Sequence, residues 1–565
     1  MRALPTPPFQ ASHPLMSERP AKRDTQSATA SALPRGLLRQ FTQPRCAPFV
    51  SIVLGVLLAQ TFGRPQLGGW SIVILAAWIS LLWADTQTLP KDRAKRGALL
   101  GFSLGLGWFT GGLWWLYISM AVYGGMAPPI AGGALLLFCA YLALYPTLAA
   151  ALAAALAPAA GREPWKLARA IGAALALAGG WTLAEWLRGT LFTGFPWLAL
   201  GYAQVGNPLS GYAPVIGQYG VNFAAALAAA LLALLSQVSL RGALVSLGLL
   251  VALFLGGLQL QQVRWTHAVG PTLKVALLQG DVAQSEKFKP ETLGPTLQLY
   301  GDWLSSLKAN LIVTPETAVP VLPEDLDPGY LRQIERALRE HHTAALLGIP
   351  LTRGADQYTN SVLGLGGAAP YRYDKSHLVP FGEFVPYGFH WFVKLMDMPL
   401  GSFARGGLDQ PPFVVRGVKV APNICYEDLF GAQMAQRFRN PAHAPNVFAN
   451  LTNLGWFGNT IIIPQHLEIA RMRSLEFQIP GIRATNTGAT AIINAHGQVA
   501  AELPPYTVGV LTGSVQGHAG LTPFARLASR YGDWPEVLLA AFALLLGWAL
   551  TRLQRGGTHH HSARV

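Results

Sequence analysis

The pattern of apolar and polar positions divides the chain into two parts, and the change falls near residue 263. Long apolar runs follow one another through the first part. We expect membrane spans near 48–63, 69–85, 98–118, 128–157, 168–188, 216–236 and 241–260, and an eighth at Val537–Leu550. A helix needs about 20 apolar residues to cross the hydrocarbon core, so the first two runs are short, and each could instead be a core helix or a re-entrant segment. The pattern predicts a multi-span α-helical membrane domain with about eight transmembrane helices.

Residues 264–534 have a different pattern, in which short apolar runs bounded by turn residues alternate with helical periodicity. Such runs are typical of strands. The predicted strands are Leu273–Gln279, Leu311–Thr314, Ala344–Ile349, Lys419–Ile424, Val447–Leu451 and Ala489–Asn494. Helical patterns between them include Tyr330–His341 and His466–Phe477. An alternation of this length predicts one α/β domain, with a layered sheet covered by helices.

Composition supports the membrane assignment. The 565-residue chain is 51% hydrophobic and only 12% charged, whereas soluble domains contain roughly 25% charged residues. The net charge of +14 could suggest nucleic-acid binding, but much of the basic excess lies in the amino-terminal tail and in short loops between apolar runs. That placement is typical of membrane topology, and we expect no nucleic-acid partner.

Basic residues concentrate in alternate loops, which orients the spans. Besides the tail, the loop at 91–96 and the loop at 162–169 carry most of them. By the positive-inside rule the amino terminus is cytoplasmic, and seven crossings place the α/β domain on the outer side. The expected organisation is a disordered cytoplasmic tail at 1–46 without a cleavable signal peptide, seven spans at 47–263, the outer domain at 264–534, an eighth transmembrane helix at 535–553 and a cytoplasmic tail at 554–565.

Three reactive side chains, Glu316, Lys375 and Cys425, stand in or just after apolar strand-like segments. Strand ends are where α/β sheets bring side chains together in a cleft. A carboxylate can take the thiol proton, the thiolate can attack a carbonyl group and the ammonium can offset the oxyanion, which suits acyl transfer. The other cysteines, Cys46 and Cys139, are too scattered for a disulfide framework or a zinc site. We expect no metal and no cofactor.

The segments around these residues resemble the nitrilase (carbon–nitrogen hydrolase) superfamily. The fuller pattern is similar to its membrane-anchored branch, the apolipoprotein N-acyltransferases. The matching segments are His377–Pro386 (His-Leu-Val-Pro-Phe-Gly-Glu-Phe-Val-Pro), Cys425–Glu427, Glu185–Gly189, Thr193–Trp197, Trp456–Gly458, Ala470–Arg473 and Arg483–Gly488. One departure is Leu454, where the family often has an acidic residue, and its effect on that wall of the pocket stays open.

The resemblance implies a role for each matching residue. Glu316 would be the general base, Lys375 the oxyanion stabiliser and Cys425 the nucleophile. The supporting residues would be Glu383, Tyr426 and Glu427: the carboxylates hold the Lys and Cys segments or assist proton transfer, and the Tyr426 N–H is a second oxyanion donor. The resemblance also implies an α-β-β-α sandwich on eight membrane helices, in a bacterial inner membrane with the catalytic domain on the periplasmic side. Nothing in this reaction requires more than a monomer.

The implied reaction moves a fatty acyl chain from a phospholipid, by resemblance phosphatidylethanolamine, through a thioester at Cys425. The acceptor is the amino terminus of a diacylglyceryl-cysteine apolipoprotein. Because both substrates carry acyl chains, the cleft must open to the bilayer. The apolar segment Phe384–Phe392 is interpreted as a lid or arm, with internal packing as the alternative. The candidate substrate-binding residues are Phe195, Trp197, Phe384, Tyr387, Trp391 and Trp456.

Two other functions remain to be weighed against this one. In a membrane-tethered nitrilase-type amidase or hydrolase, water would resolve the same thioester, but such an enzyme needs neither an apolar arm nor several spans. A transporter or receptor would leave the Glu, Lys and Cys set unexplained, and its spans would show paired repeats. Glu185 and Arg188, one helical turn apart near a span end, could be functional or an ion pair that ties the helix to its neighbours.

Overall fold

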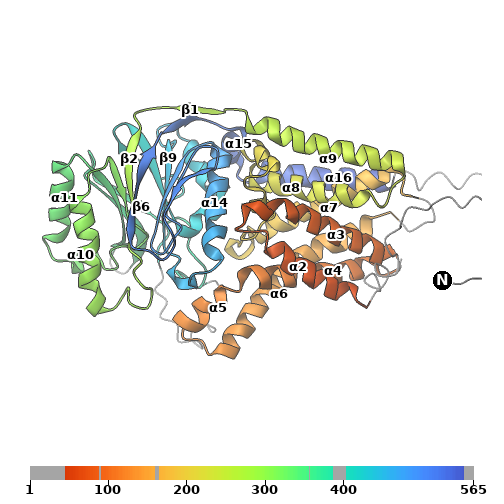
Figure 1. Cartoon of the computed structure of the whole chain (residues 1–565), viewed down its shortest axis with the longest axis horizontal. Helices are drawn as coiled ribbons and strands as arrows, with labels where there is room; N and C mark the ends of the chain where they lie inside the picture. Colours follow the sequence, from red (N-terminus) through yellow and green to blue (C-terminus); the bar gives the residue numbers. More distant parts are fainter. Residues whose placement is uncertain (1–44, 88–90, 159–163, 355–356, 386–402, 553–565) are drawn as a thin grey trace, which may run out of the picture. The chain divides into compact units, whose positions relative to one another are not determined.

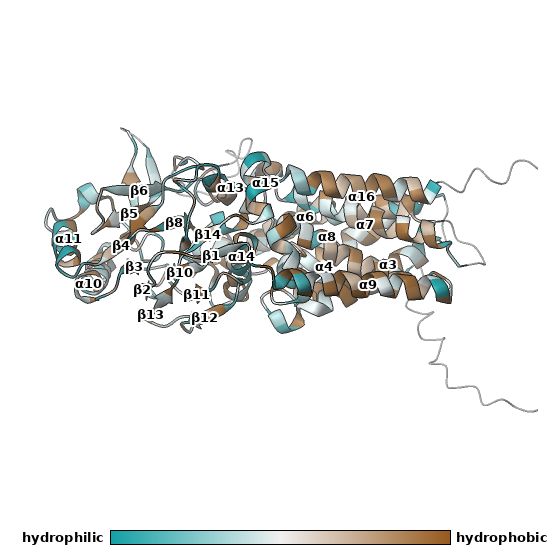
Figure 2. Cartoon of the chain, turned by 90° about the horizontal axis from the view of Figure 1, so that it is seen from above, coloured by the Kyte–Doolittle hydropathy of each residue, from teal (hydrophilic) through white to brown (hydrophobic). Residues whose placement is uncertain are grey.

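The first part of the chain is built from long apolar helices (Figures 1 and 2). The computed structural model describes residues 45–87, 91–158, 164–354, 357–385 and 403–552. Six stretches in these ranges are long and apolar enough to cross a membrane: Pro65–Gln87, Pro128–Leu156, Leu167–Arg188, Pro208–Leu234, Leu240–Gln261 and Trp534–Arg552. They contain α3 (Gly68–Gln87), α6 (Pro128–Leu156), α7 (Leu167–Arg188), α8 (Ala213–Leu234), α9 (Leu240–Gln261) and α16 (Trp534–Arg552). Figure 2 shows the hydrophobic residues concentrated along α3, α9 and α16.

A seventh span depends on a bent pair of helices. Helix α4 (Arg93–Leu113) is followed by Leu116–Tyr123, which contains α5 (Leu116–Ile118) and η2 (Ser119–Tyr123), and the two parts meet at 63°. The predicted run near 48–63 forms α2 (Ala47–Ala59), which has only 13 residues. The described residues therefore provide six or seven spans, and the eighth stays a prediction. The other short run, near 69–85, belongs to a full-length helix.

Small residues let these helices approach each other closely. A Cβ atom at Gly107 of α4 would lie 2.1 Å from the carbonyl oxygen of Ile52 in α2, and one at Gly179 of α7 would lie 2.4 Å from that of Ala540 in α16. Only glycine fits at such backbone contacts, which are typical of packed membrane helices. The Gly- and Ala-rich composition of the spans thus has a direct packing role.

The second part contains two six-stranded sheets (Figure 1). In order across the first sheet, the strands are β13 (Gly509–Val515), β2 (Leu273–Gln279), β3 (Leu311–Val313), β4 (Ala344–Thr352), β5 (Tyr358–Leu365) and β6 (Tyr371–Asp374). Across the second they are β12 (Val499–Glu502), β11 (Ala491–Ile493), β10 (Gly481–Thr485), β9 (Val447–Thr452), β8 (Val418–Ile424) and β7 (Phe413–Val415). A separate antiparallel pair joins β1 (Thr266–Ala268) to β14 (His518–Gly520).

Three apolar cores show that the sheets and helices form four layers. Side chains of both sheets, among them Leu277 and Val420, meet in one core. The other face of the first sheet packs on α10 (Pro290–Ser306) and α11 (Tyr330–Glu340). The opposite face of the second sheet packs on a helical layer whose members are α13 (Gly431–Ala435), α14 (Ile462–Phe477) and α15 (Pro523–Tyr531). This α-β-β-α sandwich confirms the predicted fold class.

Parallel pairing sets the position of the functional side chains. Strands β2, β3 and β4 run parallel in the first sheet, and β8, β9 and β10 run parallel in the second. The ends of neighbouring parallel strands lie at one edge of a sheet, and the residues that follow them gather there. All six predicted strands are present. The sequence patterns missed β1, β5, β6, β7, β10, β12, β13 and β14, several of which are short or only half buried.

Candidate active site

The three reactive residues follow strands of different sheets and meet between them. Glu316 comes three residues after β3, Lys375 follows β6 and Cys425 follows β8. Lys375 Nζ lies 3.1 Å from Oε1 of Glu316, and Lys375 and Cys425 are close enough for each to shift the pKa of the other. The structure therefore brings together the carboxylate, ammonium and thiol that the sequence singled out.

Two carboxylates share one ammonium group and one amide group. Lys375 Nζ donates to Oε1 of Glu316 and, at 2.9 Å, to Oε1 of Glu383. Asn360 Nδ2 donates to the same two oxygens at 2.7 and 2.8 Å. Burial by itself lowers the pKa of Lys375, but the carboxylates of Glu316 and Glu383 outweigh it, and the pKa ends above its usual value. Lys375 thus remains a cation at neutral pH.

The second oxygen of each carboxylate is also held. The backbone N–H of Asn453 donates to Glu316 Oε2 at 3.0 Å, and that of Val379 donates to Glu383 Oε2 at 2.8 Å. A buried lysine, Lys287, donates to the backbone carbonyl oxygen of Glu316 at 3.0 Å. Burial lowers the pKa of Lys287 to about 8, although the Glu316 carboxylate opposes the shift. Fixed carboxylates of this kind are pre-organised for proton transfer.

Cys425 lies at a sharp turn between β8 and the 3₁₀ helix η7 (Cys425–Leu429). Its φ of +50° is in the left-handed region, which non-glycine residues adopt mainly where the surroundings enforce it, often at functional sites. Its side chain is partly exposed. Burial and then the charges of Glu316 and Glu383 raise the pKa of the thiol, while Lys375 and the Asn453 N–H act in the lowering direction. The thiol is therefore protonated at neutral pH and needs a base when it attacks.

Glu427 joins the lysine segment to the cysteine segment. Its Oε1 accepts from the backbone N–H of Ser376 at 2.7 Å, and its Oε2 accepts from the backbone N–H of Ile424 at 2.6 Å. The Tyr373 hydroxyl donates to both oxygens at 2.8 Å. Because Ser376 follows Lys375 and Ile424 precedes Cys425, one buried carboxylate fixes the spacing of the ammonium and the thiol.

Contacts with the membrane helices and their loops support the turn that carries Cys425. The Tyr426 hydroxyl donates to the carbonyl oxygen of Gly194 at 2.8 Å, in the loop after α7. The indole N–H of Trp197 donates to Gln465 Oε1 of α14 at 2.9 Å. In the membrane part itself, Arg188 pairs with Glu185 and donates to the carbonyl oxygens of Phe195 and Trp197. This buried pair holds the Phe195–Trp197 loop.

The predicted substrate-binding residues lie in different surroundings. Phe195 is half buried, with its ring 5.2 Å from that of Phe138 in α6. Trp197 is buried, whereas Trp456 is 39% exposed and meets Tyr123 of η2 edge to face. Arg405 lies 4.9 Å over the Phe384 ring. The remaining two, Tyr387 and Trp391, lie outside the described residues, as does most of the predicted lid or arm.

Sequence patterns did not identify several residues of the site. Asn360 lies inside β5, Lys287 in a loop before α10 and Asn453 after β9. Each is polar and nearly inaccessible to solvent, a combination that becomes visible only in three dimensions. The departure at Leu454 is explained in part, since its side chain is buried in the large apolar core that also contains Tyr426.

Comparison with known proteins assigns the family. The model for the apolipoprotein N-acyltransferase N-terminal domain matches residues 54–231, and the carbon–nitrogen hydrolase model matches 274–523. The chain is 44% identical over 542 residues to apolipoprotein N-acyltransferase from Ralstonia nicotianae, covering 95% of this chain and 98% of the relative. The chain belongs to the apolipoprotein N-acyltransferase family. The relative from Verminephrobacter eiseniae is 48% identical over 481 residues, covering 81% of this chain and 88% of the relative.

Among solved structures, a carbon–nitrogen hydrolase from Helicobacter pylori is similar to part of this chain. It has a TM-score of 0.33 and 14% identity, covering 47% of this chain and 94% of that one. The family assignment does not depend on this match. The N-terminal domain model covers α3, α4, α6, α7 and most of α8, and the carbon–nitrogen hydrolase model covers nearly all of the two six-stranded sheets.

Proposed function

We propose that this protein transfers a fatty acyl chain from a phospholipid to the α-amino group of a diacylglyceryl-cysteine apolipoprotein, with Cys425 as the acyl carrier. The observation that supports it most strongly is the Glu316–Lys375 pair beside a thiol at a strained turn, within a chain of this family. The proposed donor is phosphatidylethanolamine. The sandwich domain faces the periplasm, and the helices lie in the inner membrane.

In the first half-reaction, Glu316 accepts the thiol proton of Cys425 while the sulfur attacks the ester carbonyl carbon of the phospholipid. Lys375 and the backbone N–H of Tyr426 stabilise the oxyanion that forms. The carbon–oxygen bond to glycerol then breaks, and Glu316 returns the proton to the leaving oxygen. The products are a lysophospholipid and a thioester. The raised pKa of the Cys425 thiol fits this order, because deprotonation is coupled to the attack rather than completed before it.

In the second half-reaction, the neutral α-amino group of the lipoprotein attacks the thioester carbonyl carbon. Glu316 takes the proton that the nitrogen loses, the carbon–sulfur bond breaks and Glu316 passes this proton to the sulfur of Cys425. The product is an amide, and the enzyme returns to its starting state. Splitting the transfer in this way predicts ping-pong kinetics. Glu383 and Asn360 act as positioning residues. Glu383 accepts a hydrogen bond from Lys375, and Asn360 donates to the carboxylates of both Glu316 and Glu383.

Aromatic residues near the membrane helices are proposed to admit the acyl chains. Trp456 and Tyr123 pack together, and Trp456 remains partly exposed. Phe192, which is 72% exposed, meets Tyr141 of α6 edge to face. Aromatic side chains favour the headgroup depth of a bilayer. This surface therefore supports a route for lipid between α5, α6 and the loop after α7.

The experiment that tests the proposal looks for the thioester directly. Purified protein is incubated with phosphatidylethanolamine without an acceptor, and intact-protein mass spectra of wild type and Cys425→Ala are compared. We expect a mass gain of one acyl chain on wild type only, which hydroxylamine and a diacylated lipopeptide both remove. An adduct that water removes as fast as lipopeptide does would favour a hydrolase. No adduct on folded wild-type protein would overturn Cys425 as the acyl carrier.

A further inference from the structure

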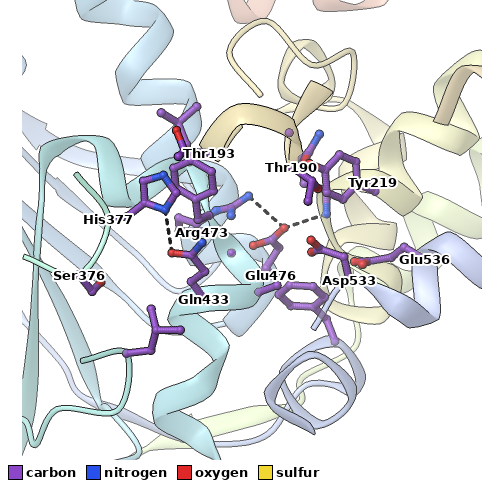
Figure 3. A pocket seen from close by; sticks show the side chains of 18 of the residues that line it. Thr190, Thr193, Tyr219, Ser376, His377, Gln433, Arg473, Glu476, Asp533 and Glu536 are labelled. Atoms are coloured by element: carbon purple, nitrogen blue, oxygen red, sulfur yellow. Dashed lines mark hydrogen bonds and ion pairs between the residues drawn. The ribbon is translucent and has the colours of Figure 1, made fainter. Parts of the chain in front are cut away.

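A pocket lies beside the proposed catalytic residues and is lined in part by acidic side chains (Figure 3). Its volume is about 420 Å³. One side consists of residues that directly follow the two reactive segments, including Ser376, His377 and Phe430. The other side comes from the start of α8, the end of α14 and the start of α16. Cys425 and Glu316 are not among the lining residues, so this space is separate from the place where the thiol would react.

Three carboxylates converge in this pocket. Figure 3 shows Glu476 of α14 directed toward Asp533 and Glu536, which lie just before and at the start of α16. Glu476 Oε1 is occupied, since it accepts from Arg473 at 3.0 Å and from the Gln218 N–H at 2.7 Å. Among the described residues, Oε2 of Glu476 and Oε2 of Glu536 have no hydrogen-bond partner, although these side chains are only 1% and 5% exposed.

Unpartnered buried carboxylate oxygens are costly, and a cation in the pocket would satisfy them. Within the described ranges, no lysine or arginine forms a salt bridge with Asp533 or Glu536; Arg473 pairs with Glu476. Burial raises the pKa of Glu476 to about 7 although Arg473 opposes the shift, and it raises that of Asp533 to about 6 although Arg473 and a hydrogen bond from Trp186 oppose it. Among the described residues, no three His, Cys, Asp or Glu side chains are placed so that they could hold one metal ion together, and this includes the three acids of the pocket. An organic cation therefore suits the pocket better than a metal ion.

Glycines keep the wall of the pocket open at the charged groups. A Cβ atom at Gly431 would lie 2.2 Å from Arg473 Nη1 and 2.6 Å from Glu476 Oε2. At Gly217, whose φ is +62°, it would lie 2.1 Å from Glu536 Oε1. The backbone at Gly431 and Gly217 therefore lies so close to the carboxylates of Glu476 and Glu536 that a larger residue would not fit there. Arg405, an exposed cation, also lines the pocket and adds a group that can bind an anion.

We propose that this pocket binds a primary ammonium group through Glu476, Asp533 and Glu536, and that the ammonium belongs to the headgroup of the aminophospholipid donor. The assignment to a lipid donor rests on the proposed function. A headgroup of this class carries an ammonium and a phosphate two carbons apart, and the lining of the pocket offers carboxylates for the ammonium and Arg405 for the phosphate. The α-amino group of the acceptor fits less well, because it must reach the acyl carbon on Cys425, which does not line the pocket.

The test measures binding rather than catalysis, in a Cys425→Ala background. Calorimetry compares short-chain phosphatidylethanolamine with phosphatidylglycerol, which has no amine. We expect the parent to prefer the ethanolamine lipid, and we expect Glu536→Gln combined with Asp533→Asn to weaken its binding roughly ten-fold, the scale of a lost charge-assisted contact. Binding of phosphatidylglycerol should not change, which also shows that the variant is folded. Glu536→Asp, which keeps the charge, should retain most of the preference.

A matched control is Glu468→Gln. Glu468 is another buried acid of α14, but it accepts from the Gly63 N–H and does not line the pocket. We expect it to leave the lipid preference unchanged. If the double variant weakens binding of a diacylated lipopeptide and not of phosphatidylethanolamine, the headgroup assignment is overturned in favour of the acceptor amine. If neither ligand is affected, there is no ammonium site.

The two proposals can fail separately. A headgroup preference that depends on Glu536 and Asp533, in a protein that forms no thioester, would keep the ammonium site and reject Cys425 as the acyl carrier. If the protein forms the thioester but its lipid preference does not change when Asp533 and Glu536 are substituted, only the ammonium site is rejected.

Discussion

Glu316 and Glu383 lie side by side because the Lys375 ammonium and the Asn360 amide each bind both carboxylates. Two neighbouring carboxylates repel each other, and the ammonium and amide donors that lie between them offset this repulsion. The proposed base is therefore held by a four-residue network. The arrangement predicts that a change at Asn360 should affect the reaction although Asn360 carries no charge.

Asn360→Asp is expected to reduce acyl transfer strongly. The substitution keeps the size of the side chain but replaces the shared donor with a third carboxylate. A loss of about 10²-fold in kcat is expected, the scale of removing one pre-organised donor from an active site. Steady-state kinetics with a diacylated lipopeptide would measure it. Asn440→Asp, in the loop after η8 (Gln436–Phe438), is the control; equal losses in the two variants would contradict the network.

Glu316→Gln is expected to make Cys425 more reactive toward a small alkylating reagent while abolishing acyl transfer. The negative charge of Glu316 helps to raise the pKa of the thiol, so a neutral side chain lowers this pKa and increases the thiolate fraction at a given pH. Peptide mass spectrometry at pH 8 to 9 would quantify alkylation at Cys425. Glu335→Gln, on the surface helix α11, should behave as wild type. Slower alkylation in Glu316→Gln would show that Glu316 lowers the pKa of the Cys425 thiol in the free enzyme, which would contradict this prediction.

Glu427→Gln is expected to slow acyl transfer and also to destabilise the folded protein. The amide cannot accept from all the donors that the carboxylate now binds. Leaving one buried donor unsatisfied costs about 1–3 kcal/mol of unfolding free energy. Thermal unfolding in detergent would report a lower midpoint. Tyr373→Phe removes a single donor and should cost less; a larger effect from Tyr373→Phe would contradict the bridging role of Glu427.

His377 is expected to make the protein acid-sensitive. Burial lowers the pKa of His377 to about 4, from 6.5, and its ring stacks on Phe430 with the centroids 3.6 Å apart. Between these values the unfolded chain binds more protons than the folded one, so this group makes stability fall as the pH drops from 6.5 toward 4. Midpoints of thermal unfolding at pH 7 and pH 5 should differ less in His377→Gln than in wild type. The exposed His496 provides the control, His496→Gln.

Several features of the fold could be predicted without coordinates because they depend on neighbours in sequence. A helix that crosses a membrane must be apolar along its whole length, so the spans are visible as runs. Buried strands such as β2 and β9 are likewise predominantly apolar segments. Edge and half-buried strands such as β12 have no such signal, because their side chains alternate between core and solvent.

The sequence by itself was enough to predict six or seven membrane spans, the layered α/β domain and the three residues that meet between the sheets, since these depend on local periodicity and on short motifs. Only the tertiary structure decided which polar residues complete the site. Asn360 on β5 and Asn453 after β9 reach Glu316 from different sheets, and Glu476 meets Asp533 across more than fifty residues of chain. No local sequence pattern predicts these contacts, because they depend on the order of the strands in the sheets and on how the helices pack. The physical reason is that the free energy of a buried polar group depends on partners that are distant in sequence.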